Sequence, residues 1–169
     1  MNAEEVVFIY QLLEQNQIEI CIDGGWGVDA LLGEQSRPHL DLDIALEHRH
    51  VPQLRQLLEA RGYHDIQRDD TRDCNFVMGD PEGRLIDIHT YVFNGEGSCI
   101  FGVEYPLESL NGTGILNGCP VRCITPAWMV KFHTGYILDE NDYHDVSLLC
   151  QRFGMALPVE YEDFIGERK

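Results

Sequence analysis

Residues 40–46 alternate between apolar and other side chains in strict succession. The apolar side chains fall on every second position: Leu40, Leu42, Ile44 and Leu46. Asp41 and Asp43 occupy positions between them. Because side chains alternate across a β-strand, the pattern predicts a strand with one buried apolar face and one acidic face. On that face the two carboxylates would lie about 6–7 Å apart and repel each other.

The acidic pair has two interpretations. Alternating Asp residues are ordinary on a strand face that is fully solvated. The same pair could instead hold a hard dication, because Mg²⁺ prefers oxygen ligands and often bridges protein carboxylates and substrate phosphates. In the second interpretation Asp41 and Asp43 are metal ligands.

A second alternating segment, residues 85–93, supplies a third carboxylate. Asp87 and His89 share one face of this predicted strand, and the opposite face is apolar. If the two strands are neighbours with their acidic faces aligned, Asp87 would join the acidic pair as a metal ligand. Placed beside an acceptor hydroxyl, it would act as a general base. His89 would be either a substrate-binding residue or an ordinary hydrogen-bonded histidine.

Gly24 and Gly25 lie between a short β-prone segment, residues 18–22, and a helix-prone segment, residues 26–32. Residues without Cβ let phosphate oxygens approach backbone N–H groups at a helix N-terminus. The order of strand, glycine turn and helix therefore predicts a nucleotide-binding site. A glycine pair is also common in simple turns, and its spacing matches neither the Walker A nor the dinucleotide motif.

Several other polar residues are weaker candidates. Arg37, in the loop before the acidic strand, could bind phosphate or pair with a nearby acid. Lys131 could contact the terminal phosphates, and His133 and Tyr136 could line a substrate pocket, although all three could equally face solvent. Cys119 and Cys123 lack a second pair of ligands at zinc spacing, which excludes a zinc site.

Helices and strands interleave early in the chain, and helices close it. Helices are predicted at residues 4–15, 26–32, 52–61, 126–136 and 142–153. Strands are predicted at residues 18–22, 40–46, 75–78, 85–93, 98–104 and 121–124, with a loop at 111–118. This order predicts an α+β, or mixed α/β, fold with a mixed β-sheet flanked by helices. We expect one domain over residues 1–169, with a core of about 5–125 and a helical part of about 126–155.

The charge balance narrows the classes of partner. Twelve Lys and Arg against 29 Asp and Glu give a formal net charge of −17, which repels nucleic acid and excludes it as a partner. Such a surface would attract a cationic small molecule, or simply keep the protein soluble. The acidic N-terminus, the absence of a long apolar stretch and six cysteines in apolar surroundings predict a cytoplasmic protein that does not bind membranes.

The motifs together resemble a known superfamily. Gly24-Gly25, Asp41-x-Asp43 and Asp87 are similar to the glycine pair, carboxylate pair and third carboxylate of polymerase-β-like nucleotidyltransferases. Residues 23–29 (DGGWGVD), 37–43 (RPHLDLD) and 85–89 (LIDIH) resemble the small lincosamide nucleotidyltransferases and their aminoglycoside-modifying relatives. Residues 133–136 and 144–145 are similar to the lincosamide branch. The resemblance covers about residues 5–150.

The resemblance implies a specific reaction. ATP or another NTP would bind with Mg²⁺, and AMP would pass to an antibiotic hydroxyl with release of pyrophosphate. Asp41 and Asp43 would hold the metal, Asp87 would be the base, and the protein would pair as a homodimer. Residues 26–40 form a stretch toward the long end of the family's spacing, which leaves the role of Arg37 open.

Two alternatives stay open at this point. In the first, a similar enzyme transfers the nucleotide to a protein side chain, as in antitoxin-like nucleotidyltransferases. In the second, a catalytically silent module holds a nucleotide or drug.

Overall fold

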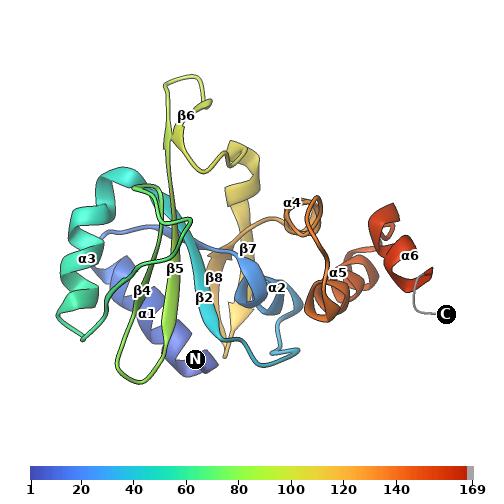
Figure 1. The fold of residues 1–169 in the computed structure, drawn as a ribbon, viewed down its shortest axis with the longest axis horizontal. Helices are drawn as coiled ribbons and strands as arrows, with labels where there is room; N and C mark the ends of the chain where they lie inside the picture. The colour runs from blue at the N-terminus through green and yellow to red at the C-terminus, as the bar shows by residue number, and fades with distance from the viewer. Residues whose placement is uncertain (167–169) are drawn as a thin grey trace.

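The alternating segment forms strand β2 (Asp41–Glu47) of a mixed β-sheet in the computed structural model, which describes residues 1–166. Within these residues eight strands form one sheet in the order β3-β4-β5-β2-β1-β8-β7, with β6 paired to β5 (Figure 1). The other strands are β1 (Ile20–Ile22), β3 (His64–Ile66), β4 (Asn75–Gly79), β5 (Leu85–Phe93), β6 (Cys99–Gly102), β7 (Gly112–Leu116) and β8 (Cys119–Cys123). Strand β2 runs parallel to β5 and antiparallel to β1. The predicted mixed sheet is confirmed.

Helices cover both faces of the sheet. They are α1 (Ala3–Gln15), α2 (Gly24–Leu32), α3 (Val51–Glu59), α4 (Pro126–Phe132), α5 (Glu140–Phe153) and α6 (Val159–Gly166), with 3-10 turns at His48–His50 and Leu107–Asn111. Helices α1 and α3 lie on one side of the sheet, and α2, α4 and α5 lie on the other (Figure 1). Among residues 1–166, no helix is both long enough and apolar enough to cross a membrane.

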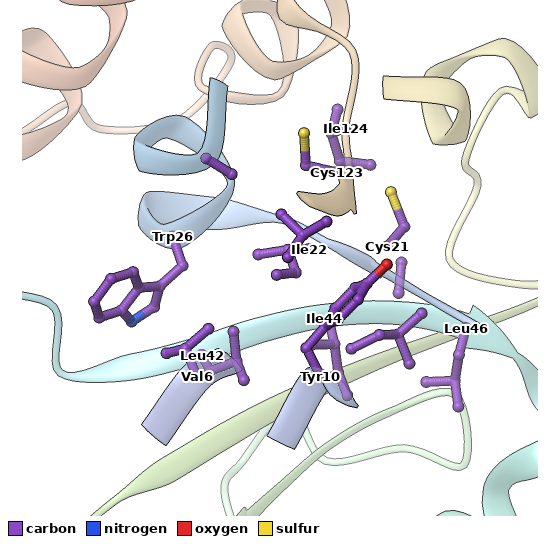
Figure 2. Close-up of a cluster of buried hydrophobic side chains, with 14 of the residues drawn as sticks. Val6, Tyr10, Cys21, Ile22, Trp26, Leu42, Ile44, Leu46, Cys123 and Ile124 are labelled. Atoms are coloured by element: carbon purple, nitrogen blue, oxygen red, sulfur yellow. The ribbon is translucent and has the colours of Figure 1, made fainter. Parts of the chain in front are cut away.

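The core forms where the apolar face of β2 meets α1. Val6 and Tyr10 of α1 lie beside Leu42 and Ile44 of β2 (Figure 2), and all four are buried. The same hydrophobic cluster extends as far as Tyr161 in α6. Leu40, predicted to belong to this face, instead precedes the strand and has 84% of its side chain exposed. The alternation alone did not show that pairing with β5 begins only at Asp41.

The glycine-rich segment 111–118 was wrongly predicted to be only a loop. Its residues 112–116 form β7, which pairs antiparallel with β8. A Cβ at Gly114 would collide with the backbone of Ala30 in α2, so this strand needs glycine to pack against the helix. Local composition indicated a turn, and close packing overrode it.

Other elements also differ from the sequence predictions. Strand β3 and helix α6 were not predicted. Helix α4 ends at Phe132 rather than Tyr136. The positive φ of Gly135, +85°, excludes a helix that continues to Tyr136. Thr125 is the N-cap residue of α4, and its side chain makes no capping hydrogen bond. Residues 167–169, the end of the predicted single domain, lie outside the described residues.

Candidate active site

The two alternating strands place their carboxylates on one face of the sheet. Strands β2 and β5 are parallel neighbours, and Asp43 is the direct register partner of Asp87. Neighbouring strands lie about 4.8 Å apart, so these two side chains emerge close together. Asp41 lies two residues before Asp43 on the same face. The sheet therefore brings together three acids that are far apart in the sequence.

The glycine pair lies beside these acids, at the start of α2. Asp23 caps the helix, its side chain accepting a hydrogen bond from the Gly24 N–H at 2.8 Å. Gly24 has a φ of +55°, and a Cβ there would collide with the Asp43 carboxylate. A Cβ at Gly25 would collide with the His39 ring. The glycines thus form the first helical turn, rather than a separate turn before it, and they make room for polar side chains at the helix N-terminus.

Asp43 lies in a strongly negative environment. Burial raises the pKa of its carboxyl group to about 7, and the charges of Asp41 and Asp23 add to the effect. No described side chain donates a hydrogen bond to this carboxylate. The positive end of the α2 dipole and a bound cation are the stabilising influences that such a site can use.

Two basic side chains flank Asp87. Arg68 Nη1 lies 3.3 Å from its Oδ2, and His89 Nε2 lies 3.4 Å from its Oδ1. The Oδ1 atom is buried and accepts no hydrogen bond from the described residues. Arg68, in the loop between β3 and β4, was missed because no motif marks it.

A buried hydrogen-bond chain connects His89 to the start of α2. His89 Nδ1 lies 3.1 Å from the Tyr105 hydroxyl, which lies 2.7 Å from Asp23 Oδ2. Burial lowers the pKa of His89, but Asp87, Asp23 and Asp43 outweigh it and the net pKa is raised. Tyr105 and Asp23 were also missed as site residues.

A cavity of about 380 Å³ opens beside this chain of hydrogen bonds. The surface of its walls is mainly apolar, although charged residues also line it. The lining residues are Asp23, His89, Val103, Glu104, Tyr105 and Phe132. Glu104 is exposed, and no cation among residues 1–166 pairs with it. His89, which lines the cavity, also contacts Asp87, so a small molecule bound in the cavity would be close to the acids.

The three acids fit a hard dication in charge and donor type. The raised pKa of Asp43 indicates negative charge around this residue that the described residues leave uncompensated. The buried Oδ1 of Asp87 still has a free position for a ligand. Within residues 1–166, however, no three acidic, His or Cys side chains are arranged to hold a metal ion as they stand. Coordination would therefore require the acidic side chains to move from the positions that they occupy here.

Arg37 is held by a buried partner. Its Nε and Nη2 atoms donate to both oxygens of Asp145 in α5, with Nη2 at 2.6 Å from Oδ2. The guanidinium also lies near Gly25, so its charge reaches the start of α2. Buried Asp29 pairs with His39, which supports the same loop. Of the two roles considered for Arg37, phosphate binding and pairing with an acid, the structure shows the pairing with an acid.

The remaining candidates lie on or after α4. The exposed side chain of Lys131 stacks over Trp128, with Nζ at 4.3 Å from the ring centroid. His133 Nδ1 bonds to the Met129 carbonyl, and the Tyr136 hydroxyl donates to Asp142. None of these three side chains lines the cavity beside His89. Their predicted roles in phosphate and substrate binding stay predictions.

Sequence comparison assigns this arrangement to a family. Residues 5–149 match the family model for aminoglycoside-2''-adenylyltransferase. The chain belongs to this family. It is therefore a nucleotidyltransferase of the adenylyltransferase type. The lincosamide resistance protein of Staphylococcus haemolyticus is 31% identical over 156 residues, which cover 88% of this chain and 94% of that protein.

Solved structures agree with this assignment. The crystal structure of the lincosamide antibiotic adenylyltransferase LnuA with lincomycin bound has a TM-score of 0.75 and 28% identity, covering 86% of this chain and 94% of that chain. The crystal structure of ANT(2'')-Ia with adenylyl-2''-tobramycin has a TM-score of 0.75 at 19% identity, covering 99% and 98%. The second likeness establishes the fold alone. The resemblance inferred from the sequence motifs is confirmed.

Proposed function

We propose that the protein transfers AMP from ATP, in the presence of Mg²⁺, to a hydroxyl group of a lincosamide or aminoglycoside antibiotic and releases pyrophosphate. The observation that carries the proposal is the register pairing of Asp43 with Asp87 beside Gly24. Membership of an adenylyltransferase family supports it. A cytoplasmic location, expected from the sequence, and a homodimer, implied by the family resemblance, complete the proposal.

The nucleotide would bind at the start of α2. Backbone N–H groups around Gly24 and Gly25 would face the phosphates, and Asp41, Asp43 and Asp87 would hold Mg²⁺. When bound, Mg²⁺ would neutralise phosphate charge and draw the α-phosphate toward the acceptor. Because Arg37 is engaged by Asp145, it would contribute its charge more than new hydrogen bonds. Lys131 would reach the terminal phosphates.

The acceptor would bind in the cavity beside His89. Asp87 would take the proton of the attacking hydroxyl, and the apolar walls would exclude water. The unpaired Glu104 carboxylate would attract an ammonium group of the acceptor. The related LnuA binds lincomycin, and ANT(2'')-Ia binds adenylyl-tobramycin, so both antibiotic classes belong in the test.

The deciding experiment is a screen for nucleotidyl adducts. Lincosamides and aminoglycosides are incubated with ATP, GTP, CTP or UTP and Mg²⁺, and the products are analysed by mass spectrometry and a pyrophosphate assay. We expect an AMP adduct on one antibiotic class. Transfer of AMP to a protein side chain, and not to an antibiotic, would favour the protein-modifying alternative. Nucleotide binding without turnover across the panel would favour the silent module.

Variants of the three acids test the assigned roles. Asp41→Asn and Asp43→Asn should abolish pyrophosphate release while the fold stays intact. Asp87→Asn should slow transfer more than it weakens ATP binding. Equal losses in both would make Asp87 a metal ligand only. Asp65→Asn is the matched control, because Asp65 pairs with Arg55 at the surface and should leave turnover unchanged.

A further inference from the structure

Tyr105 has a buried hydroxyl group that the proposed reaction does not use. The residue lies between β6 and the 3-10 turn at Leu107–Asn111, and only 4% of its surface is exposed. Its ring packs edge-on against Tyr91 and Phe132. The hydroxyl lies between Asp23 and His89, which belong to elements on different sides of the candidate site.

The number of protons available determines which group donates in each bond. A tyrosine hydroxyl has one proton, and an ionised carboxylate only accepts. The hydroxyl lies 2.7 Å from Asp23 Oδ2 and 3.1 Å from His89 Nδ1, so the shorter, charge-assisted bond takes the proton. His89 Nδ1 must then donate to the phenolic oxygen. Nδ1 therefore carries a proton, and Nε2 points toward Asp87.

Asp23 extends this chain to the glycine turn. Its Oδ1 accepts the Gly24 N–H at 2.8 Å, and its backbone N–H donates to the Asp43 carbonyl at 2.9 Å. The same carboxylate therefore holds the first turn of α2 and the Tyr105 hydroxyl. Movement at either end would have to break a buried hydrogen bond, which is costly.

We propose that Tyr105 is a positioning residue, whose hydroxyl orients the His89 ring against Asp87 and links that orientation through Asp23 to the glycine turn. The inference rests on the proposed function, in which the acceptor binds beside His89 and the phosphates bind at Gly24. The Tyr105 hydroxyl takes no part in proton transfer from the acceptor hydroxyl to Asp87. It holds His89, beside the acceptor, in a fixed position relative to the glycine turn, where the phosphates bind.

The first test reads the His89 ring directly and needs no activity. In ¹⁵N-labelled protein at alkaline pH, where imidazole is neutral, we expect His89 Nδ1 to bear the proton. Tyr105→Phe removes the acceptor for that proton, which should move to Nε2. Assignment uses His89→Gln. Finding Nδ1 unprotonated in the wild type, or the same tautomer in Tyr105→Phe, would overturn the proposal, whether or not the enzyme adenylylates an antibiotic.

The second test separates positioning from a merely structural effect. Tyr105→Phe should lower kcat about tenfold or more, with KM for ATP changed less than about threefold. Tyr10→Phe is the matched control, because Tyr10 is also buried and its hydroxyl also bonds to a carboxylate, in α1 on the other side of the sheet. That variant should leave both constants unchanged. Equal rises in KM and falls in kcat for Tyr105→Phe would count against positioning.

A double-mutant cycle tests whether Tyr105 acts through His89. Because Tyr105 is proposed to act through His89, adding Tyr105→Phe to His89→Gln should reduce kcat little beyond the single change. Fully additive losses would show that Tyr105 acts by another route and would overturn the proposal.

Discussion

At the residue scale, the missing side chain of Gly24 decides where Asp43 can lie. The Asp43 carboxylate occupies the space that a Cβ at Gly24 would need, next to the N-terminus of α2. The glycine was predicted as an open phosphate cradle. The nearby Asp43 carboxylate indicates a second reason why glycine is needed at position 24, because a larger residue would displace this acid of the candidate site.

Gly24→Ala should therefore cost function more than stability. Left-handed backbone costs alanine about 1–2 kcal/mol, and the Asp43 carboxylate would have to turn away. We expect transfer activity to fall at least about 100-fold, or about 2.7 kcal/mol. The matched control is Gly33→Ala, at the other end of α2, where φ is +81° and no atom crowds the new Cβ. Similar activity in the two variants would contradict the expected collision between a Cβ at residue 24 and the Asp43 carboxylate.

Asp43 should make the metal-free protein less stable as the pH rises. Its folded-state pKa of about 7 lies above the ordinary 3.8, so the folded protein holds this proton more tightly than the unfolded chain. Stability is therefore lost as the pH rises from about 4 to about 7 and stays lower above that. In EDTA at pH 8, the Asp43→Asn variant should unfold at a higher urea concentration than the wild type. Its free energy of unfolding should be higher by on the order of 2 kcal/mol.

The same comparison has an internal control. At about pH 3 the carboxyl group is largely protonated in both states, so the gain from Asp43→Asn should nearly vanish. Adding Mg²⁺ at pH 8 should stabilise the wild type and not the variant. A gain that is independent of pH would contradict the raised pKa.

At the scale of elements, one buried ion pair ties the loop before β2 to α5. The Asp145 side chain is 1% exposed and accepts hydrogen bonds from Arg37 on both carboxylate oxygens. Arg37 belongs to the motif preceding the acidic strand. Two segments that resembled the same family thus contact each other across 108 residues of sequence. Their pairing positions the strand that carries Asp41 and Asp43.

Breaking this pair should be strongly destabilising. Asp145→Asn leaves the Arg37 charge partly buried without its partner, and we expect a loss of about 3 kcal/mol in urea unfolding. Arg37→Lys should also be destabilising, because lysine cannot bind both carboxylate oxygens at once. The control is Glu19→Gln, which breaks an exposed pair with Arg122 and should cost less than about 1 kcal/mol. Equal costs for the two pairs would contradict this interpretation.

At the scale of the whole molecule, the formal net charge of −17 should make folding sensitive to salt. Self-repulsion among the acids weakens the compact state, and salt screens it. Raising NaCl from about 20 mM to about 200 mM at pH 8 should raise Tm by several degrees. Near pH 4.5, the sequence pI, the effect should disappear. A fall in Tm with salt at pH 8 would show that surface ion pairs dominate instead.

Side-chain periodicity was sufficient to predict much of the sheet and the three acids. Alternation along residues 40–46 and 85–93 is a local property, so it predicted both strands and the faces of Asp41, Asp43 and Asp87. Their combination with the glycine pair indicated the family. The strands that departed from local composition, β3 and β7, could not be found this way. Each is stabilised by pairing with the strand that follows it, and β7 also packs against α2, and neither contact leaves an alternating pattern.

Only the tertiary structure decided which polar residues surround these acids. Arg68, Tyr105 and Asp23 come from three separate parts of the chain, and they meet near β5 because of the strand order. Arg37, predicted for phosphate, faces Asp145 for the same reason. Hydrogen bonds and ion pairs depend on distance in space, whereas alternation depends on position in the chain. The sequence could therefore predict the three carboxylates but not the partners that position them.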